Sequence, residues 1–124
     1  MDRMSSMPAE QTKQLLEVYR RNLGVLRRNS VQILIGSDQF RKNARDEALS
    51  LAREKLLTSE ELLHAWCEVT PQAIFPKRKI TRLKDGYEAN FVVLRTNPLE
   101  DFTAVKDVLM TFKFGEQVGP PPKK

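Results

Sequence analysis

Apolar residues in the first part of the 124-residue chain recur every three or four positions, which is the spacing of an amphipathic helix. This pattern predicts a helix from Pro8 to Arg28, and Pro8 suits its first turn because an N–H there would have no helical partner. A similar pattern predicts a second helix over about residues 43–56. The apolar stripe of the first helix consists of Leu15, Tyr19, Leu23 and Leu26.

A capping box precedes the next predicted helix. The Thr58 hydroxyl can accept from the N–H of Glu61, and the Glu61 side chain can bond back to the N–H of Thr58. We expect a helix from Ser59 to about Cys67, followed by a separate short helical turn that begins at Thr70-Pro71 and ends near Pro76.

Residues 31–35 (Val-Gln-Ile-Leu-Ile) form a short apolar run between the first two predicted helices. Such a β-branched run is typical of a parallel strand that is covered on both faces. Gly36-Ser37-Asp38 ends the run abruptly. The order of helix, buried strand and helix predicts an α/β fold over residues 1–76.

After Pro76 the apolar period changes from about four to two, which predicts strands. We expect strands over 87–94 and 108–114, with a glycine turn at Gly115 and a last short strand over 116–118. Phe102 and Val105 are expected to anchor the connection between the first two strands. Residues 77–118 therefore form a predicted β part, and the Pro-rich basic tail, 119–124, is predicted to be disordered.

Composition narrows the class of protein. Hydrophobic residues make up 40% and charged residues 30%, with no apolar run near the roughly 20 residues that span a bilayer. The polar N-terminal segment lacks a signal-peptide pattern, so we expect a cytoplasmic protein with no membrane contact.

The net charge of +5 and basic clusters such as Lys77-Arg78-Lys79 would suit a surface that binds nucleic acid. No recognised nucleic-acid motif accompanies them, which favours solvated faces.

Asp38 is the leading candidate for chemistry. In α/β folds functional groups follow the carboxyl ends of strands, where a carboxylate can ligate a metal or act as a general base. Its alternative role is to cap the following loop or helix. His64 is the single histidine and Cys67 the single cysteine, so a multi-histidine centre, a disulfide and a thiolate metal site are excluded within this sequence. We interpret both as ordinary helix residues.

Three stretches resemble the C-terminal end of the metal-dependent amidohydrolase superfamily, in the branch related to imidazolonepropionase. Residues 31–38 resemble the last barrel strand with its terminal aspartate, and residues 58–75 resemble the exit stretch "Ser-x-x-Glu-x-Leu … Thr-x-x-x-Ala". The most specific match is "Ile-Gly-x-Leu-x-x-Gly-x-x-Ala-Asp-Phe-Val-Val-Leu … Asn-Pro-Leu", which resembles residues 76–99. Thr81 and Asn90 depart from it, standing where the family usually has glycine and aspartate.

The resemblance implies a fold class of α/β plus β: the helix-strand-helix-helix end of a (β/α)8 (TIM) barrel over 1–76, then part of a small β-sandwich domain over 77–118. It implies zinc-dependent, or other divalent-metal-dependent, hydrolysis of amide or cyclic amide C–N bonds. The family aspartate that matches Asp38 ligates the metal and shuttles the proton. The family's His-x-His pair and later histidines have no counterpart here.

We therefore expect a truncated hydrolase that is inactive alone and holds no stable metal. The alternative is a non-catalytic module that self-associates, binds nucleic acid, or pairs with a chain that supplies the missing barrel. Exposed apolar surface on Ile33, Ile35, Phe91 or Phe112 would favour self-association.

Overall fold

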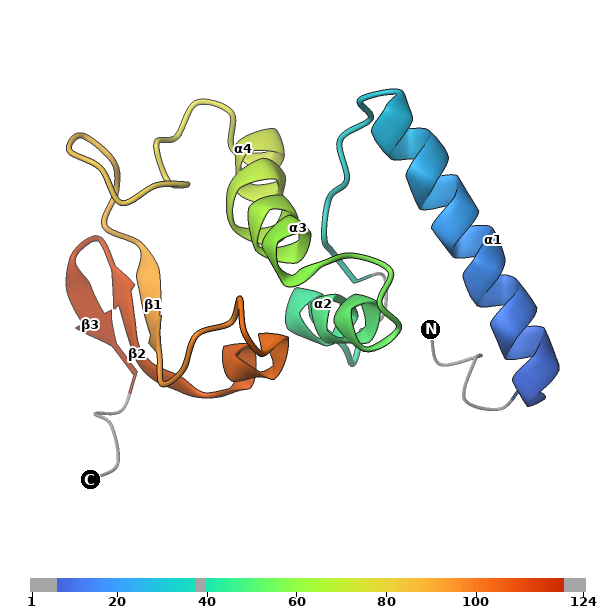
Figure 1. The fold of residues 1–124 in the computed structure, drawn as a ribbon. Coiled ribbons are helices and arrows are strands. Elements are labelled where there is room, and N and C mark those ends of the chain that lie inside the picture. Colours follow the sequence, from blue (N-terminus) through green and yellow to red (C-terminus); the bar gives the residue numbers. More distant parts are fainter. Residues whose placement is uncertain (1–6, 38–39, 120–124) are drawn as a thin grey trace.

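The computed structural model describes residues 7–37 and 40–119, and it arranges them as helices at one end and a small sheet at the other (Figure 1). The helix α1 lies at one side, α2, α3 and α4 lie in the middle, and the sheet β1-β2-β3 lies at the opposite side (Figure 1). The bounds are α1 Ala9–Arg28, α2 Ala44–Arg53, α3 Ser59–His64, η2 Ala65–Val69, α4 Thr70–Ile74, β1 Phe91–Leu94, η3 Phe102–Lys106, β2 Val108–Lys113 and β3 Glu116–Val118.

The helix α1 confirms the predicted first helix, with Pro8 as its N-cap residue. Its C-terminus closes in a Schellman turn, in which the Ser30 N–H bonds the Arg27 carbonyl at 3.0 Å and the Val31 N–H bonds the Leu26 carbonyl at 3.0 Å. Ser30 takes a left-handed φ of 54° at this turn. The local exit from α1 is therefore fixed by backbone hydrogen bonds.

The capping box predicted before α3 is confirmed by both of its hydrogen bonds. The Glu61 N–H donates to the Thr58 Oγ1 at 3.2 Å, and the Thr58 N–H donates to the Glu61 Oε2 at 2.8 Å. A second box, between Asn43 and Asp46, starts α2. The helix α2 ends at Arg53, earlier than the expected 56, and Lys55 then adopts a φ of 51°.

The expected break between a helix ending at Cys67 and a new turn at Thr70 is wrong. The segments α3, η2 and α4 follow one another directly, and residues at both junctions, Ala65 and Thr70, keep right-handed helical dihedrals. The middle segment, η2, is a π-helix. Pro71 lies in the first turn of α4, directly after η2.

The predicted parallel strand over 31–35 is also wrong, because residues 31–37 have no regular secondary structure. A strand requires a neighbouring strand for its backbone hydrogen bonds, and the strands of the described residues all lie between 91 and 118. The run is buried on one side only. Ile35 is 3% exposed and Ile33 packs beside it, whereas Leu34 is 49% exposed.

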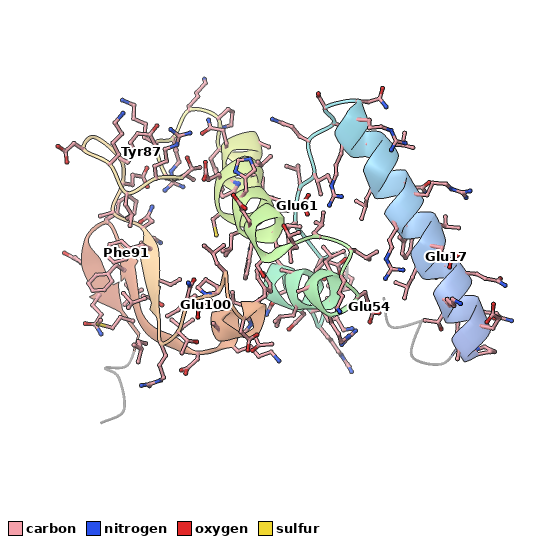
Figure 2. All side chains as sticks on the ribbon, viewed as in Figure 1. Glu17, Glu54, Glu61, Tyr87, Phe91 and Glu100 are labelled. Atoms are coloured by element: carbon pink, nitrogen blue, oxygen red, sulfur yellow. The ribbon has the colours of Figure 1, made fainter. Side chains whose placement is uncertain are left out.

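The three strands form an antiparallel sheet in the order β1-β2-β3, as the period-two pattern predicts. Phe91, which is labelled in Figure 2, lies in β1 and pairs with Phe112 in β2. Their rings stack with centroids 4.6 Å apart. The strand β1 begins at Phe91 rather than at the predicted residue 87. The glycine turn between β2 and β3 is confirmed, with positive φ at both Phe114 (52°) and Gly115 (80°).

One hydrophobic core joins the two predicted parts of the chain. Phe102 and Val105 of η3, expected as anchors, are 5% and 6% exposed and pack with helical residues. The helical and connecting members of this cluster are Ile35, Ala48, Leu57, Leu62 and Ala65.

The domain boundary near residue 76 stays a prediction, and residues 120–124 of the predicted tail lie outside the described residues. No helix in the described ranges is long and apolar enough to cross a membrane.

Candidate functional site

Asp38, the leading candidate, lies outside the described residues, so its catalytic role stays a prediction. The structure does describe the backbone that leads to it. The Ile35 N–H donates to the Thr70 Oγ1 at 2.8 Å, and the Thr70 hydroxyl donates to the Ala65 carbonyl at 2.7 Å. Thr70 is 9% exposed and is the buried polar residue of the described chain. Sequence reasoning missed this contact, since its two ends are separated by 35 positions.

His64 lies on the surface at the end of α3, as its interpretation as a helix residue requires. Its Nδ1 is 3.7 Å from the Glu68 Oε1, and the other Glu68 oxygen is 3.8 Å from Arg82. These side chains are between 41% and 63% exposed, so solvent screens the attraction between them. They border a shallow groove of about 390 Å³ next to Gln32 and Gln72.

Cys67 is exposed as a residue, yet nearby protein atoms remove enough water from its thiol to raise the pKa of that group. The adjacent Glu68 carboxylate raises the same pKa further, because a negative charge disfavours the thiolate. Both causes act in one direction, so the thiol is kept neutral. A neutral thiol is a poor nucleophile, which agrees with the structural interpretation of this cysteine.

The basic run 77–79 contributes a structural ion pair. Arg78 makes a two-point contact with Glu88 at 3.0 and 2.5 Å, and its guanidinium lies 5.2 Å from the centre of the Phe75 ring. The hydrogen bond from Arg78 holds the pKa of Glu88 below its ordinary value. Asn90 donates to Glu88 at 2.9 Å and accepts from the Phe114 N–H at 2.9 Å. Asn90, where residues 76–99 depart from the pattern that they resemble, therefore makes structural polar contacts.

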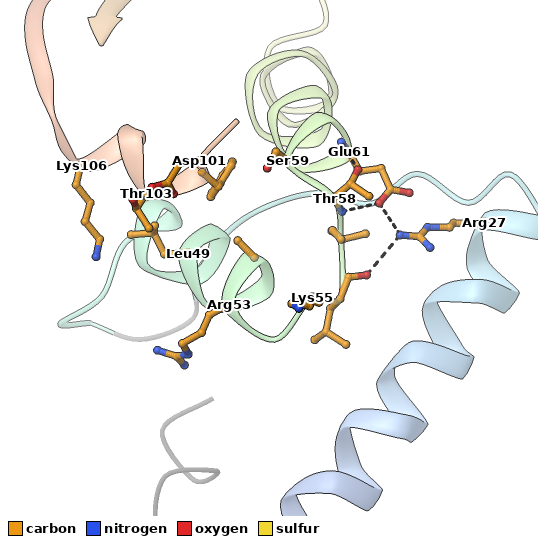
Figure 3. A pocket seen from close by; sticks show the side chains of 14 residues that line it. Arg27, Leu49, Arg53, Lys55, Thr58, Ser59, Glu61, Asp101, Thr103 and Lys106 are labelled. Carbon is orange, nitrogen blue, oxygen red and sulfur yellow. Dashed lines mark hydrogen bonds and ion pairs between the residues drawn. The ribbon is translucent and has the colours of Figure 1, made fainter. Parts of the chain in front are cut away.

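A larger cleft of about 750 Å³ opens between α2, the start of α3 and η3 (Figure 3). Its acidic groups are already engaged. Glu61 accepts from Arg27 at 2.8 Å as well as from its capping partner, and Asp101 accepts from the Thr103 N–H at 2.9 Å (Figure 3). The bonds from Thr103 lower the pKa of Asp101. The Asp101 carboxyl group is thus not held protonated for acid catalysis.

The described residues do not assemble a metal site. They contain no group of three or more histidine, cysteine, aspartate and glutamate side chains able to hold a metal ion. His64 lies 3.7 Å from a Glu68 oxygen, and Cys67 is a free, exposed cysteine.

Comparison with known proteins reveals a shared fold. No protein-family model and no curated protein sequence matches this chain. Solved structures match this chain, and two of them, with a TM-score of 0.68 each, are structures of one and the same protein. That protein is described as uncharacterised in the first, at 23% identity, and as a prolidase in complex with N-methylphosphonate-L-proline in the second, at 24% identity. Each match covers 91% of this chain and 30% of the other chain. The mixed helical and antiparallel fold therefore corresponds to a fragment of a larger protein, of which this chain spans about 30%.

Proposed function

We propose that this chain is part of a hydrolase of the amidohydrolase superfamily that cleaves C–N bonds, and that it carries only part of the catalytic site. The backbone match to a structure named prolidase, over 91% of this chain, is the observation that supports the proposal most directly. The sequence resemblance at residues 76–99 adds to it independently. The placement in the imidazolonepropionase-related branch, with a barrel end followed by part of a β-sandwich, belongs to this proposal.

In this proposal Asp38 is the chain's contribution to a metal site, and the described side chains do not complete that site. The single histidine lies beside Glu68 on the exposed surface of a helix. Two or more further ligands are needed for a divalent metal bound by protein side chains. They would come from polypeptide outside the 124 residues, either in the same chain or in a separate one. We derive no catalytic step from the residues present.

The first experiment measures the metal content and the hydrolytic activity of the purified chain. We expect substoichiometric zinc after dialysis and no zinc-dependent cleavage of an X–Pro dipeptide or a cyclic amide. Asp38→Ala should leave both measurements unchanged in the isolated chain. One tightly bound zinc per chain that is lost on Asp38→Ala would contradict the proposed incompleteness of the site.

The second experiment tests the hydrolase assignment itself. The DNA upstream of the coding sequence is read for an in-frame or adjacent stretch that encodes a His-x-His pair, and that stretch is co-expressed with this chain. We expect zinc binding and C–N bond cleavage that fall at least about 100-fold on Asp38→Ala, because the carboxylate would be both ligand and proton acceptor. Asp46→Asn, which alters a helix cap instead, is the matched control. A metal-loaded assembly without hydrolysis of either substrate would refute the assignment.

Self-association is the second candidate function. The side chains expected to favour it are not exposed, since Ile35 is buried and Ile33, Phe91 and Phe112 are half-buried, but other apolar side chains are exposed. Val25 and Leu26 on α1 are 43% and 38% exposed, and Val31 and Leu34, which follow, are 48% and 49% exposed. Neighbouring apolar groups of this kind mark interaction surfaces. Light scattering over a concentration series discriminates, since a monomer at all concentrations would exclude self-association. A salt-dependent mobility shift with RNA or DNA would instead support nucleic-acid binding.

A further inference from the structure

The buried Thr70 hydroxyl links two segments that are distant in the sequence. It accepts the Ile35 N–H at 2.8 Å and donates to the Ala65 carbonyl at 2.7 Å, so both capacities of the hydroxyl are used inside the protein. The same Ala65 carbonyl also accepts the backbone N–H of Thr70. Thr70 is therefore held by its own helix while its hydroxyl binds the backbone N–H of Ile35.

The π-helix η2 explains why Thr70 can reach this position. In a regular α-helix, residues five apart lie about 140° from each other around the axis, since each residue adds about 100°. A π-helix bonds each N–H to the carbonyl five residues earlier, which brings positions 65 and 70 onto one side. Ala65 is 6% exposed and belongs to the core, so the Thr70 side chain is brought to the buried side.

The contact restrains the segment that leads to Asp38. Upstream, the Val31 N–H bonds the Leu26 carbonyl at 3.0 Å, and Ile33 and Ile35 pack on the core. The Thr70 bond holds the Ile35 backbone as well as its side chain.

We propose that Thr70 is a positioning residue, whose hydroxyl is brought to the core by η2 and fixes the Ile35 backbone on the approach to Asp38. The bond itself is a property of this chain whatever its activity. Its consequence for catalysis rests on the proposed function, because only there does Asp38 have a role. Thr70 acts through the backbone of Ile35 and touches no reacting group.

Amide hydrogen exchange, measured residue by residue by NMR on the 124-residue chain, tests the inference. Thr70→Val keeps the shape of the side chain but removes the hydroxyl, so we expect the Ile35 amide to exchange at least about tenfold faster. Thr70→Ser retains the hydroxyl and should keep the exchange within about threefold of the original. Thr12→Val, the same change at an exposed hydroxyl on α1, is the matched control and should leave Ile35 unchanged.

Three results would overturn the inference. Ile35 exchange could be unaffected by Thr70→Val, or Thr70→Ser could fail to preserve its protection. Alternatively, the amide of Leu62, which bonds the Thr58 carbonyl in α3, could accelerate by the same factor as Ile35, which would reveal general destabilisation rather than positioning. If Thr70→Val does not fold, the amide exchange rates of the unmodified chain provide the test. The Ile35 amide should then exchange more slowly than the amide of the half-exposed Leu34, and equal rates would refute the hydrogen bond.

The test of the Thr70 contact and the test of the proposed function can fail independently of each other. Hydrogen exchange reports on the Thr70 contact in the isolated chain, where we expect no bound metal. Zinc content and hydrolysis report on Asp38 in the co-expressed assembly. A lost contact with intact hydrolysis would reject Thr70 alone, and a confirmed contact without hydrolysis would reject the enzyme assignment alone.

Discussion

Leu62 is the residue whose replacement tests the shared core most directly. It is 0% exposed and is the largest side chain that is fully buried in the described residues. It lies in α3, and its cluster includes Phe102 and Val105 from the other predicted part. Leu62→Ala removes three carbon atoms from this cluster and leaves a cavity that a tightly packed interior fills only in part.

The expected cost follows from the burial. Leu→Ala changes at fully buried positions cost about 3–5 kcal/mol, through lost transfer free energy and the cavity that remains. The small size of this core places Leu62→Ala near the lower end, at about 3 kcal/mol. That is a large share of the roughly 5–15 kcal/mol by which natural domains are stable. With a urea m-value of about 1.5 kcal/mol/M, the midpoint should fall by about 2 M.

Urea unfolding followed by two signals provides the assay. Trp66, the single tryptophan, packs against the same cluster and reports by fluorescence, while far-ultraviolet circular dichroism reports on helices and strands. Leu83→Ala is the matched control, because Leu83 is 78% exposed and its truncation should cost less than about 0.5 kcal/mol. We expect both signals to shift together, since one core joins the two parts.

Two outcomes would refute this reasoning. A loss below about 1 kcal/mol for Leu62→Ala, similar to that of Leu83→Ala, would show that the core is not packed as described. Separate midpoints for fluorescence and circular dichroism would show that the helical part and the sheet unfold independently.

Three further predictions concern local contacts. Thr58→Ala removes the hydroxyl that accepts from the Glu61 N–H and caps α3, and it should lower the free energy of unfolding in urea by about 1 kcal/mol. Thr58→Ser retains the hydroxyl and should cost much less. Lys55→Gly should raise stability by about 0.5–1 kcal/mol, because the φ of 51° favours glycine; a lower urea midpoint would contradict this. Arg78 lowers the pKa of Glu88 from its ordinary value of 4.5, so the folded state favours the carboxylate. This stabilisation is present above pH 4.5 and is lost as pH falls through the lower folded pKa. The stability difference between the unmodified chain and Glu88→Gln should therefore shrink in acid, and a pH-independent difference would exclude the ion pair as its cause.

The sequence predicted most of the local structure because the relevant partners lie within a few positions. The capping box joins Thr58 and Glu61, and the turn at Gly115 joins adjacent strands. Helical and strand periods likewise depend on neighbours three to four, or two, positions away. For the site, residue type and order identified Asp38 as a candidate, and the single histidine showed that this sequence cannot supply a multi-histidine metal centre.

Contacts between distant segments were decided by the tertiary structure alone. Residues 31–35 have the composition of a buried strand, but a strand exists only where another strand satisfies its backbone, and none adjoins them in the described chain. The Ile35 N–H bonds Thr70 instead, through a π-helix that periodicity did not indicate. Composition and spacing thus determined which residues favour helix, strand or chemistry, whereas the packing of segments 35 positions apart determined which backbone groups they meet.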